Sequence, residues 1–144
     1  MKECILFLLA MGMVVFGGCS SSTELLKNAK FPEITNNDYS TVYMFRDSNL
    51  FGSAIASPIQ INGLYLFRIG NGDCVTFKIP TGQSEIVYVS ETKRVKFGSE
   101  RGKNYYFYLR VEAGKSDSDL RQLTEEEWNE KQKACNWVEL KKEK

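Results

Sequence analysis

The chain has 144 residues, which suits one compact domain with short extensions. Its 19 Lys and Arg residues nearly balance 18 Asp and Glu residues, so no global charge draws it toward nucleic acid or acidic lipid. Histidine is absent, which excludes histidine general bases, serine–histidine or cysteine–histidine nucleophile pairs, and imidazole-ligated metals. We therefore expect no nucleic-acid partner, no metal site and no cofactor.

An apolar leader opens the chain. Lys2 supplies a positive charge ahead of Cys4–Gly18, a run without charged residues. This run is shorter than the roughly 20 residues that a membrane-spanning helix needs. It matches the apolar segment of a secretory signal peptide. We predict that residues 1–18 are a signal peptide that is removed.

The end of the leader carries a lipidation motif. Phe16-Gly17-Gly18-Cys19 resembles a bacterial lipobox, in which small residues precede a cysteine at the edge of the apolar segment. The resemblance implies that Cys19 becomes the mature N-terminus and carries diacylglycerol on its sulfur, which anchors the protein in a membrane. Residues 19–38 are then a lipidated N-terminus and polar tether, and Ser20 after the cysteine resembles an outer-membrane sorting signal. The alternative is an ordinary signal peptide cleaved near Gly18.

Short strands separated by turn residues follow from Tyr39 onward. Ser40–Arg46 is rich in β-branched and aromatic residues, and Asn62-Gly63 between two apolar runs is typical of a two-residue hairpin turn. Two later stretches alternate apolar and polar residues, with apolar faces formed by Val75, Phe77 and Ile79 and by Tyr105, Phe107, Leu109 and Val111. The pattern predicts a mainly β domain over residues 39–140, a small antiparallel β-sandwich or open barrel of about seven strands.

A C-terminal helix is predicted over about residues 125–135. Thr124 and Glu127 form the T-x-x-E pattern of a capping box, and acidic residues fill the first turn, where the helix dipole favours them. Trp128 is expected to face the sheet.

Cys74 and Cys135 are the two cysteines of the predicted domain. In an oxidising compartment such a pair favours a disulfide, which would clip the helix to the turn at Gly70–Cys74. The alternative is two small apolar side chains that never meet.

Four segments give the domain a recognisable order: Val42–Arg46, Ile59–Gly63, Ile79–Gln83 and Gly102–Phe107. Their sequences and spacing between Ser40 and Cys135 resemble a family of small bacterial lipoproteins whose β-sandwich domain has no assigned function. The resemblance implies a fold and an envelope location. It implies no catalytic residue.

Five residues are candidates for contact with a partner. Leu50 and Phe51 place apolar side chains in a turn-rich stretch. Tyr106 and Tyr108 alternate with inward residues and suggest an aromatic strip for a sugar or a peptide backbone, the alternative being packing beneath the C-terminal helix. Lys96 belongs to a basic cluster that suits an acidic partner or is only a solvated face.

We expect a non-enzymatic envelope protein, in the periplasm or at the outer membrane, that is anchored through Cys19 and binds a protein or a glycan. One alternative is a carboxylate-dependent enzyme acting on cell-wall glycan, which needs two carboxyl groups about 5–10 Å apart. Another is a structural or stress-related spacer of the envelope.

Overall fold

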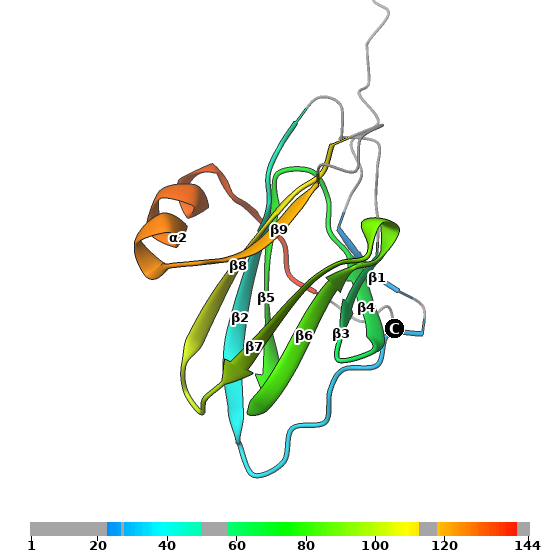
Figure 1. Cartoon of the computed structure of the whole chain (residues 1–144), viewed down its shortest axis with the longest axis vertical. Helices are drawn as coiled ribbons and strands as arrows, with labels where there is room; N and C mark the ends of the chain where they lie inside the picture. Colours follow the sequence, from blue (N-terminus) through cyan, green and yellow to red (C-terminus); the bar gives the residue numbers. More distant parts are fainter. Residues whose placement is uncertain (1–22, 27, 50–57, 113–117, 141–144) are drawn as a thin grey trace, which may run out of the picture.

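The computed structural model describes residues 23–26, 28–49, 58–112 and 118–140, which fold into two facing β-sheets (Figure 1). The first, which we call the β6 sheet, has the order β1 (Glu24–Leu25), β4 (Leu64–Arg68), β3 (Pro58–Ile61), β6 (Gly82–Tyr88) and β7 (Lys93–Ser99). The second, the β2 sheet, has the order β10 (Asn136–Trp137), β5 (Asp73–Pro80), β2 (Tyr39–Arg46), β8 (Asn104–Arg110) and β9 (Asp119–Leu123). Three short helices complete these ranges: η1 (Val89–Glu91), α2 (Glu125–Lys131) and η2 (Gln132–Ala134).

The predicted class, mainly β with one C-terminal helix, is confirmed, and of the two predicted architectures the strands adopt the sandwich. The described residues contain ten strands, where the sequence predicts about seven. Part of the excess comes from β1 and β10, two-residue strands at sheet edges that are too short to show a period-two pattern.

Most strand pairs are antiparallel, as predicted, but β2 pairs with β8 in parallel and β10 pairs with β5 in parallel. The chain reverses direction between successive strands from β2 to β8 (Figure 1). An even number of reversals leaves β2 and β8 running the same way, so they pair in parallel when they become neighbours.

The predicted hairpin turn between β3 and β4 is confirmed. Asn62 and Gly63 both have positive φ, 49° and 81°, as a type I′ turn requires. The turn is also held to β6, since the backbone N–H of Glu85 donates to the side-chain oxygen of Asn62 at 2.8 Å. The turn therefore fixes both the hairpin and its register against the next strand.

The core lies between the two sheets. Most residues of the predicted apolar faces are buried in it: Val75, Ile79, Phe107, Leu109 and Val111 are each at most 1% exposed, and Phe77 is 7% exposed. Tyr105 is partly buried and packs against this core. Phe67 and Phe77 meet across the sheets at 5.4 Å between ring centroids, as do Phe97 and Phe107 at 4.8 Å. Burying each such side chain contributes about 1.5–3 kcal/mol, so this interior is the main source of stability.

Arg46 ends β2 inside the protein, with 1% of its surface exposed. Its Nη1 donates to the carbonyl oxygen of Ile69 at 2.7 Å, which ties the end of β4 to β2. Burial lowers the pKa of this guanidinium, and nearby Tyr88 and Asp73 oppose the shift. Arg46 is thus a structural group within the sandwich.

The C-terminal helix α2 begins as predicted and ends earlier. The Thr124 hydroxyl accepts from the backbone N–H of Glu127 at 3.2 Å, and the Glu127 carboxylate accepts from the backbone N–H of Thr124 at 2.9 Å. After Lys131 the chain tightens into η2, so the predicted span of 125–135 divides into two helices. Trp128 is buried at 3% exposure against the β2 sheet, as expected.

The sandwich takes up chain that the sequence assigns to the tether. Residues 24 and 25, within the predicted tether of residues 19–38, form β1 and pair with β4. No helix within the described ranges has the length and apolar character to cross a membrane.

Glu127→Gln should reduce the pH dependence of stability in mild acid. The backbone N–H of Thr124 and the guanidinium of Arg121 lower the pKa of the Glu127 carboxyl below its usual 4.5. A carboxyl with a lower pKa in the folded state stabilises the fold above its unfolded pKa and loses that contribution as pH falls through the folded value. Urea midpoints of wild type and variant should therefore differ at neutral pH and converge in acid.

The matched control is Glu126→Gln in the same helical turn, for which no such convergence is expected. A midpoint difference at position 127 that stays constant from neutral to acid pH would contradict this account.

Candidate functional site

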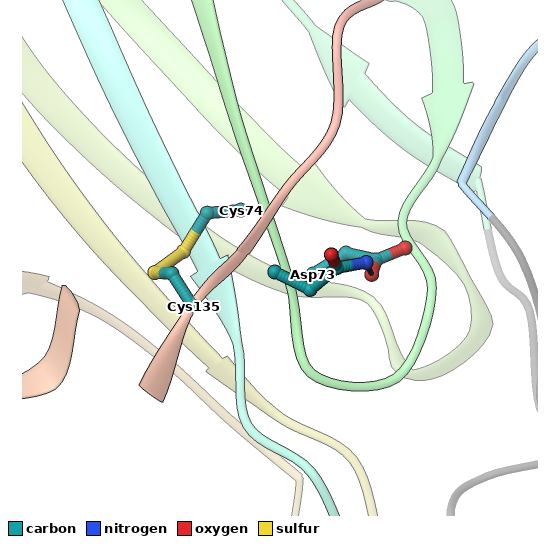
Figure 2. Close-up of a disulfide and its surroundings, with 4 residues drawn as sticks. Asp73, Cys74 and Cys135 are labelled. Carbon is teal, nitrogen blue, oxygen red and sulfur yellow. Dashed lines mark hydrogen bonds between the residues drawn. A yellow bond between two sulfur atoms is a disulfide. The ribbon is translucent and has the colours of Figure 1, made fainter. Parts of the chain in front are cut away.

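Cys74 and Cys135 form the predicted disulfide, with their Cα atoms 5.4 Å apart (Figure 2). Cys74 belongs to β5 and is fully buried, while Cys135 directly follows η2. The bond fixes the chain that leaves α2 to the beginning of β5. From there β10 runs beside β5 as a parallel edge strand.

Hydrogen bonds extend this attachment on both sides of the disulfide. Asn136 donates from Nδ2 to the Asp73 carboxylate at 2.7 Å and from its backbone N–H to the carbonyl of Gly72 at 3.0 Å. The backbone N–H of Val138 donates to the carbonyl of Cys74 at 2.9 Å. Residues 136–138 therefore have a fixed position on the β2 sheet.

Four aromatic rings from four elements meet on the outer face of the β2 sheet. The Tyr106 ring stacks on Trp128 at 5.3 Å with an interplanar angle of 18°, and Tyr43 lies 5.4 Å from Tyr106. Trp137 approaches edge-on, 6.3 Å from Tyr43 and 6.0 Å from Trp128. These centroid distances lie in the range of favourable aromatic pairs.

The four rings differ in exposure. Trp128 is buried and supports the others, whereas Trp137 is 49% exposed, the one large hydrophobic side chain so exposed among the described residues. Tyr43 and Tyr106 are partly buried between them. We call Tyr43, Tyr106 and Trp137 the aromatic platform. It is a preformed apolar surface, because each ring belongs to a strand fixed by its neighbours.

Of the two predicted tyrosines, only Tyr106 belongs to this platform. Tyr108 is 5% exposed, its hydroxyl donates to Asp47, and the ammonium of Lys131 lies 4.4 Å above its ring. Burial raises the pKa of Tyr108, and the hydrogen bond to Asp47 adds to this shift. Tyr108 therefore packs beneath α2, the alternative that the sequence left open.

The remaining predicted contact residues do not join the platform. Lys96 lies on β7 of the opposite sheet, with 74% of its side chain exposed and its ammonium 3.9 Å from Glu85. Leu50, Phe51 and Cys19 lie outside the described residues, so their predicted roles stay predictions.

Sequence reasoning missed Tyr43 and Trp137 as surface residues. In the sequence, Tyr43 is one of several aromatic residues in a predicted strand, and nothing marks it as exposed. Trp137 follows the predicted helix, where no alternation or turn motif predicts a strand. The usable signal is the disulfide, because bonding Cys135 to Cys74 necessarily brings Trp137 to β5.

A separate hollow of about 350 Å³ lies at the end of the sandwich where β2 begins, lined by Asn37, Tyr39, Arg101 and Gly102. The ammonium of Lys78 lies 4.0 Å from the centroid of the Tyr39 ring. The hollow is thus bordered by the guanidinium of Arg101 and by the Tyr39 ring, which already contacts Lys78. The platform residues do not line it.

A family model described as a protein of unknown function (DUF2846) matches residues 36–121, more than half of the chain. The match includes Tyr43, Cys74 and Tyr106, and it ends before Cys135 and Trp137. The comparisons with curated proteins and with solved structures found no match. The platform is therefore interpreted from the residues of this chain.

Replacing both cysteines, as Cys74→Ser with Cys135→Ser, should lower the free energy of unfolding by about 2–4 kcal/mol, because a long closed loop constrains the unfolded chain. The two cysteines are 61 residues apart in sequence. The variant should also make Trp137 more accessible to acrylamide, since β10 loses its covalent attachment. Urea unfolding and fluorescence quenching measure the two effects, and reduced wild-type protein is the matched control.

Mass spectrometry of the non-reduced protein should show the linked Cys74–Cys135 peptide. Two alkylatable thiols in native protein would contradict the disulfide.

Proposed function

The chain belongs to the DUF2846 family, whose function is unknown, and we propose that it is a non-enzymatic, lipid-anchored protein of the bacterial envelope that binds a glycan on the aromatic platform. The observation that carries the proposal is a half-exposed Trp137 held edge-on against Tyr43 and Trp128 by strand pairing and a disulfide. The lipid anchor is proposed from the sequence at Cys19.

The anchor is supported by the leader. Cys4–Gly18 supplies the apolar segment, and Gly17 and Gly18 supply the small residues before Cys19. An outer-membrane location is proposed from Ser20. A single acyl chain gives only marginal binding, so the diacylglycerol expected on Cys19 would be needed for stable attachment.

The platform suits a sugar because its chemistry is mixed. The C–H face of a pyranose ring packs on aromatic carbon, while its hydroxyl groups need polar partners at the edge. Thr76 pairs with Tyr43 across β5 and β2 and is exposed, so it offers a hydroxyl beside the platform. Because the rings are already ordered, little conformational entropy is lost when they bind.

A non-enzymatic role is supported by the composition of the whole chain. No histidine is present to act as a general base or to activate a serine or cysteine. The thiols of Cys74 and Cys135 are joined in the disulfide and cannot act as nucleophiles.

Cys19→Ala should move the protein from the membrane fraction to the soluble fraction, because it removes the sulfur that would carry lipid. Ser20→Ala, one residue away, is the matched control and should stay in the membrane. Intact mass of the wild-type protein should show cleavage before Cys19 and an added diacylglycerol. Membrane retention of the Cys19→Ala variant would contradict the anchor.

Trp137→Ala should weaken binding of a soluble glycan by about tenfold or more, equivalent to about 1.4 kcal/mol. The reason is the loss of the exposed ring on which the sugar packs. Titration calorimetry with peptidoglycan-derived glycan strands and chito-oligosaccharides measures the effect. Unfolding stability should fall by about 1–3 kcal/mol, because two edge-on ring contacts are also lost, and the variant should stay folded.

Lys96→Ala, on the other sheet, is the matched control and should bind as wild type does. Wild-type protein that binds none of these glycans would refute the glycan proposal, as would equal affinity of the wild type and the Trp137→Ala variant.

A further inference from the structure

Thr23 is fixed to the sandwich by its side chain. Its hydroxyl accepts from the backbone N–H of Gly70 at 2.8 Å and donates to the carboxylate of Asp73 at 2.6 Å. Gly70 belongs to the turn that joins β4 to β5, and Asp73 is the first residue of β5. Asp73 is 6% exposed, so the hydrogen bond to its carboxylate is shielded from water.

The residues after Thr23 strengthen this attachment. Glu24 pairs in register with Arg68 on β4, and their side chains form an ion pair at 3.0 Å. Leu25 packs against the core, and the backbone N–H of Leu26 donates to the carbonyl of Leu66 at 3.3 Å. Residues 23–26 are therefore fixed to the sandwich.

Covalent geometry limits the distance between this attachment and Cys19. Only Ser20, Ser21 and Ser22 separate Cys19 from Thr23. A fully extended chain spans at most about 3.3–3.6 Å per residue, so the Cα atoms of Cys19 and Thr23 lie within about 14 Å of each other.

Strand register defines the two ends of the sandwich. The anchor end carries the turn Gly70–Asp73, and the far end carries Asn62-Gly63 and Gly102, whose N–H donates to Tyr39 at the start of β2 (Figure 1). The eight residues of β5 run from one end to the other, a length of about 26 Å at 3.3 Å per residue. The strand is thus about twice as long as the reach from Thr23 to Cys19.

We infer that the anchor end rests against the membrane that holds the lipid of Cys19, so that the sandwich stands on this end and its far end points away. The inference depends on the proposed lipidation of Cys19. β1 enters the sheet at the anchor end and runs antiparallel to β4. Thr23, which precedes β1, therefore lies at that end.

Two arginines at the anchor end have carboxylate partners. Arg68 pairs with Glu24, and Arg110 at the end of β8 pairs with Glu112. Since these two cations have carboxylate partners, they add little attraction to anionic lipid, and we expect the covalent attachment to set the orientation. The orientation should then be the same on neutral and on anionic membranes.

The upright orientation also places the aromatic platform. Trp137 pairs with Cys74 near the anchor end and Tyr43 pairs with Thr76 farther along β5, so the platform lies on the outer face of the β2 sheet, on the side toward the anchor end. A glycan could reach it from the side while the anchor end stays on the membrane.

The test compares one probe at each end of the full-length lipidated protein. Ser48→Cys, exposed near Gly72, labels the anchor end, and Lys103→Cys, exposed beside Gly102, labels the far end. A fluorophore is attached to each introduced thiol with the native disulfide intact. The proteins are reconstituted into vesicles of phosphatidylethanolamine, with or without phosphatidylglycerol, that contain a lipid with a nitroxide headgroup.

Quenching should be several-fold stronger at position 48 than at position 103 in both kinds of vesicle. Insertion of about 20 Gly and Ser residues between Ser22 and Thr23 lengthens the average reach by about 25 Å. This insertion should abolish most of the difference between the two probes while lipidation, confirmed by intact mass, is unchanged.

Equal quenching at the two positions in lipidated protein would refute the orientation and leave the anchor intact; a sandwich lying on its side would give this result. A difference that survives the insertion would also refute it, because the short connection would then not be its cause. Absence of lipid on Cys19 would overturn both the proposed anchor and the orientation.

Discussion

The two hydrogen bonds to the Asp73 carboxylate, from Thr23 and from Asn136, determine how the first and last described segments are arranged. One oxygen accepts from Thr23, the other accepts from Asn136, and the residue is 6% exposed. A buried carboxylate is costly unless its oxygens are hydrogen-bonded. Here the two donors come from opposite ends of the described chain, so satisfying one buried group fixes two segments that no local pattern would place.

The surroundings of Asp73 connect these segments to the core. Asp73 begins β5, and the next residue is the disulfide-bonded Cys74. The negative charge of Asp73 also opposes the effect of burial, which lowers the pKa of Arg46. Arg46 in turn holds the carbonyl of Ile69 at the end of β4. The turn between β4 and β5 is therefore where the two sheets, the first strand and the C-terminal segment meet.

Sequence patterns predicted the parts of the fold whose causes are local. Asn62-Gly63 can adopt two positive φ values in succession, and the Thr124–Glu127 capping box needs only its own four residues. The alternation around Phe107 reports which face is buried, and the burial confirms it. These signals do not depend on how distant segments meet, so the sequence alone could predict these features.

The features that the sequence did not predict are non-local. The parallel pairing of β2 with β8 depends on the number of chain reversals between them, and β1 and β10 exist because longer strands offer them an edge. The same holds for the site. Tyr106 and Tyr108 alternate identically with the core residues, yet α2 and Asp47 bury Tyr108, while Tyr106 joins a surface completed by Trp137.

The two ends of the chain are joined through a single turn, and this links the proposed anchor to the proposed binding surface. If Cys19 carries lipid, a force on the anchor passes through Thr23 to Gly70 and Asp73, and from Asp73 through Asn136 to the neighbouring Trp137. The disulfide provides a second, covalent path from β5 to the same segment. A binding surface placed elsewhere on the sandwich would be connected to the anchor only through many strand pairs. Trp137 of the aromatic platform instead follows Asn136, which shares the Asp73 carboxylate with Thr23, so the proposed orientation on the membrane would also set the direction in which the platform faces.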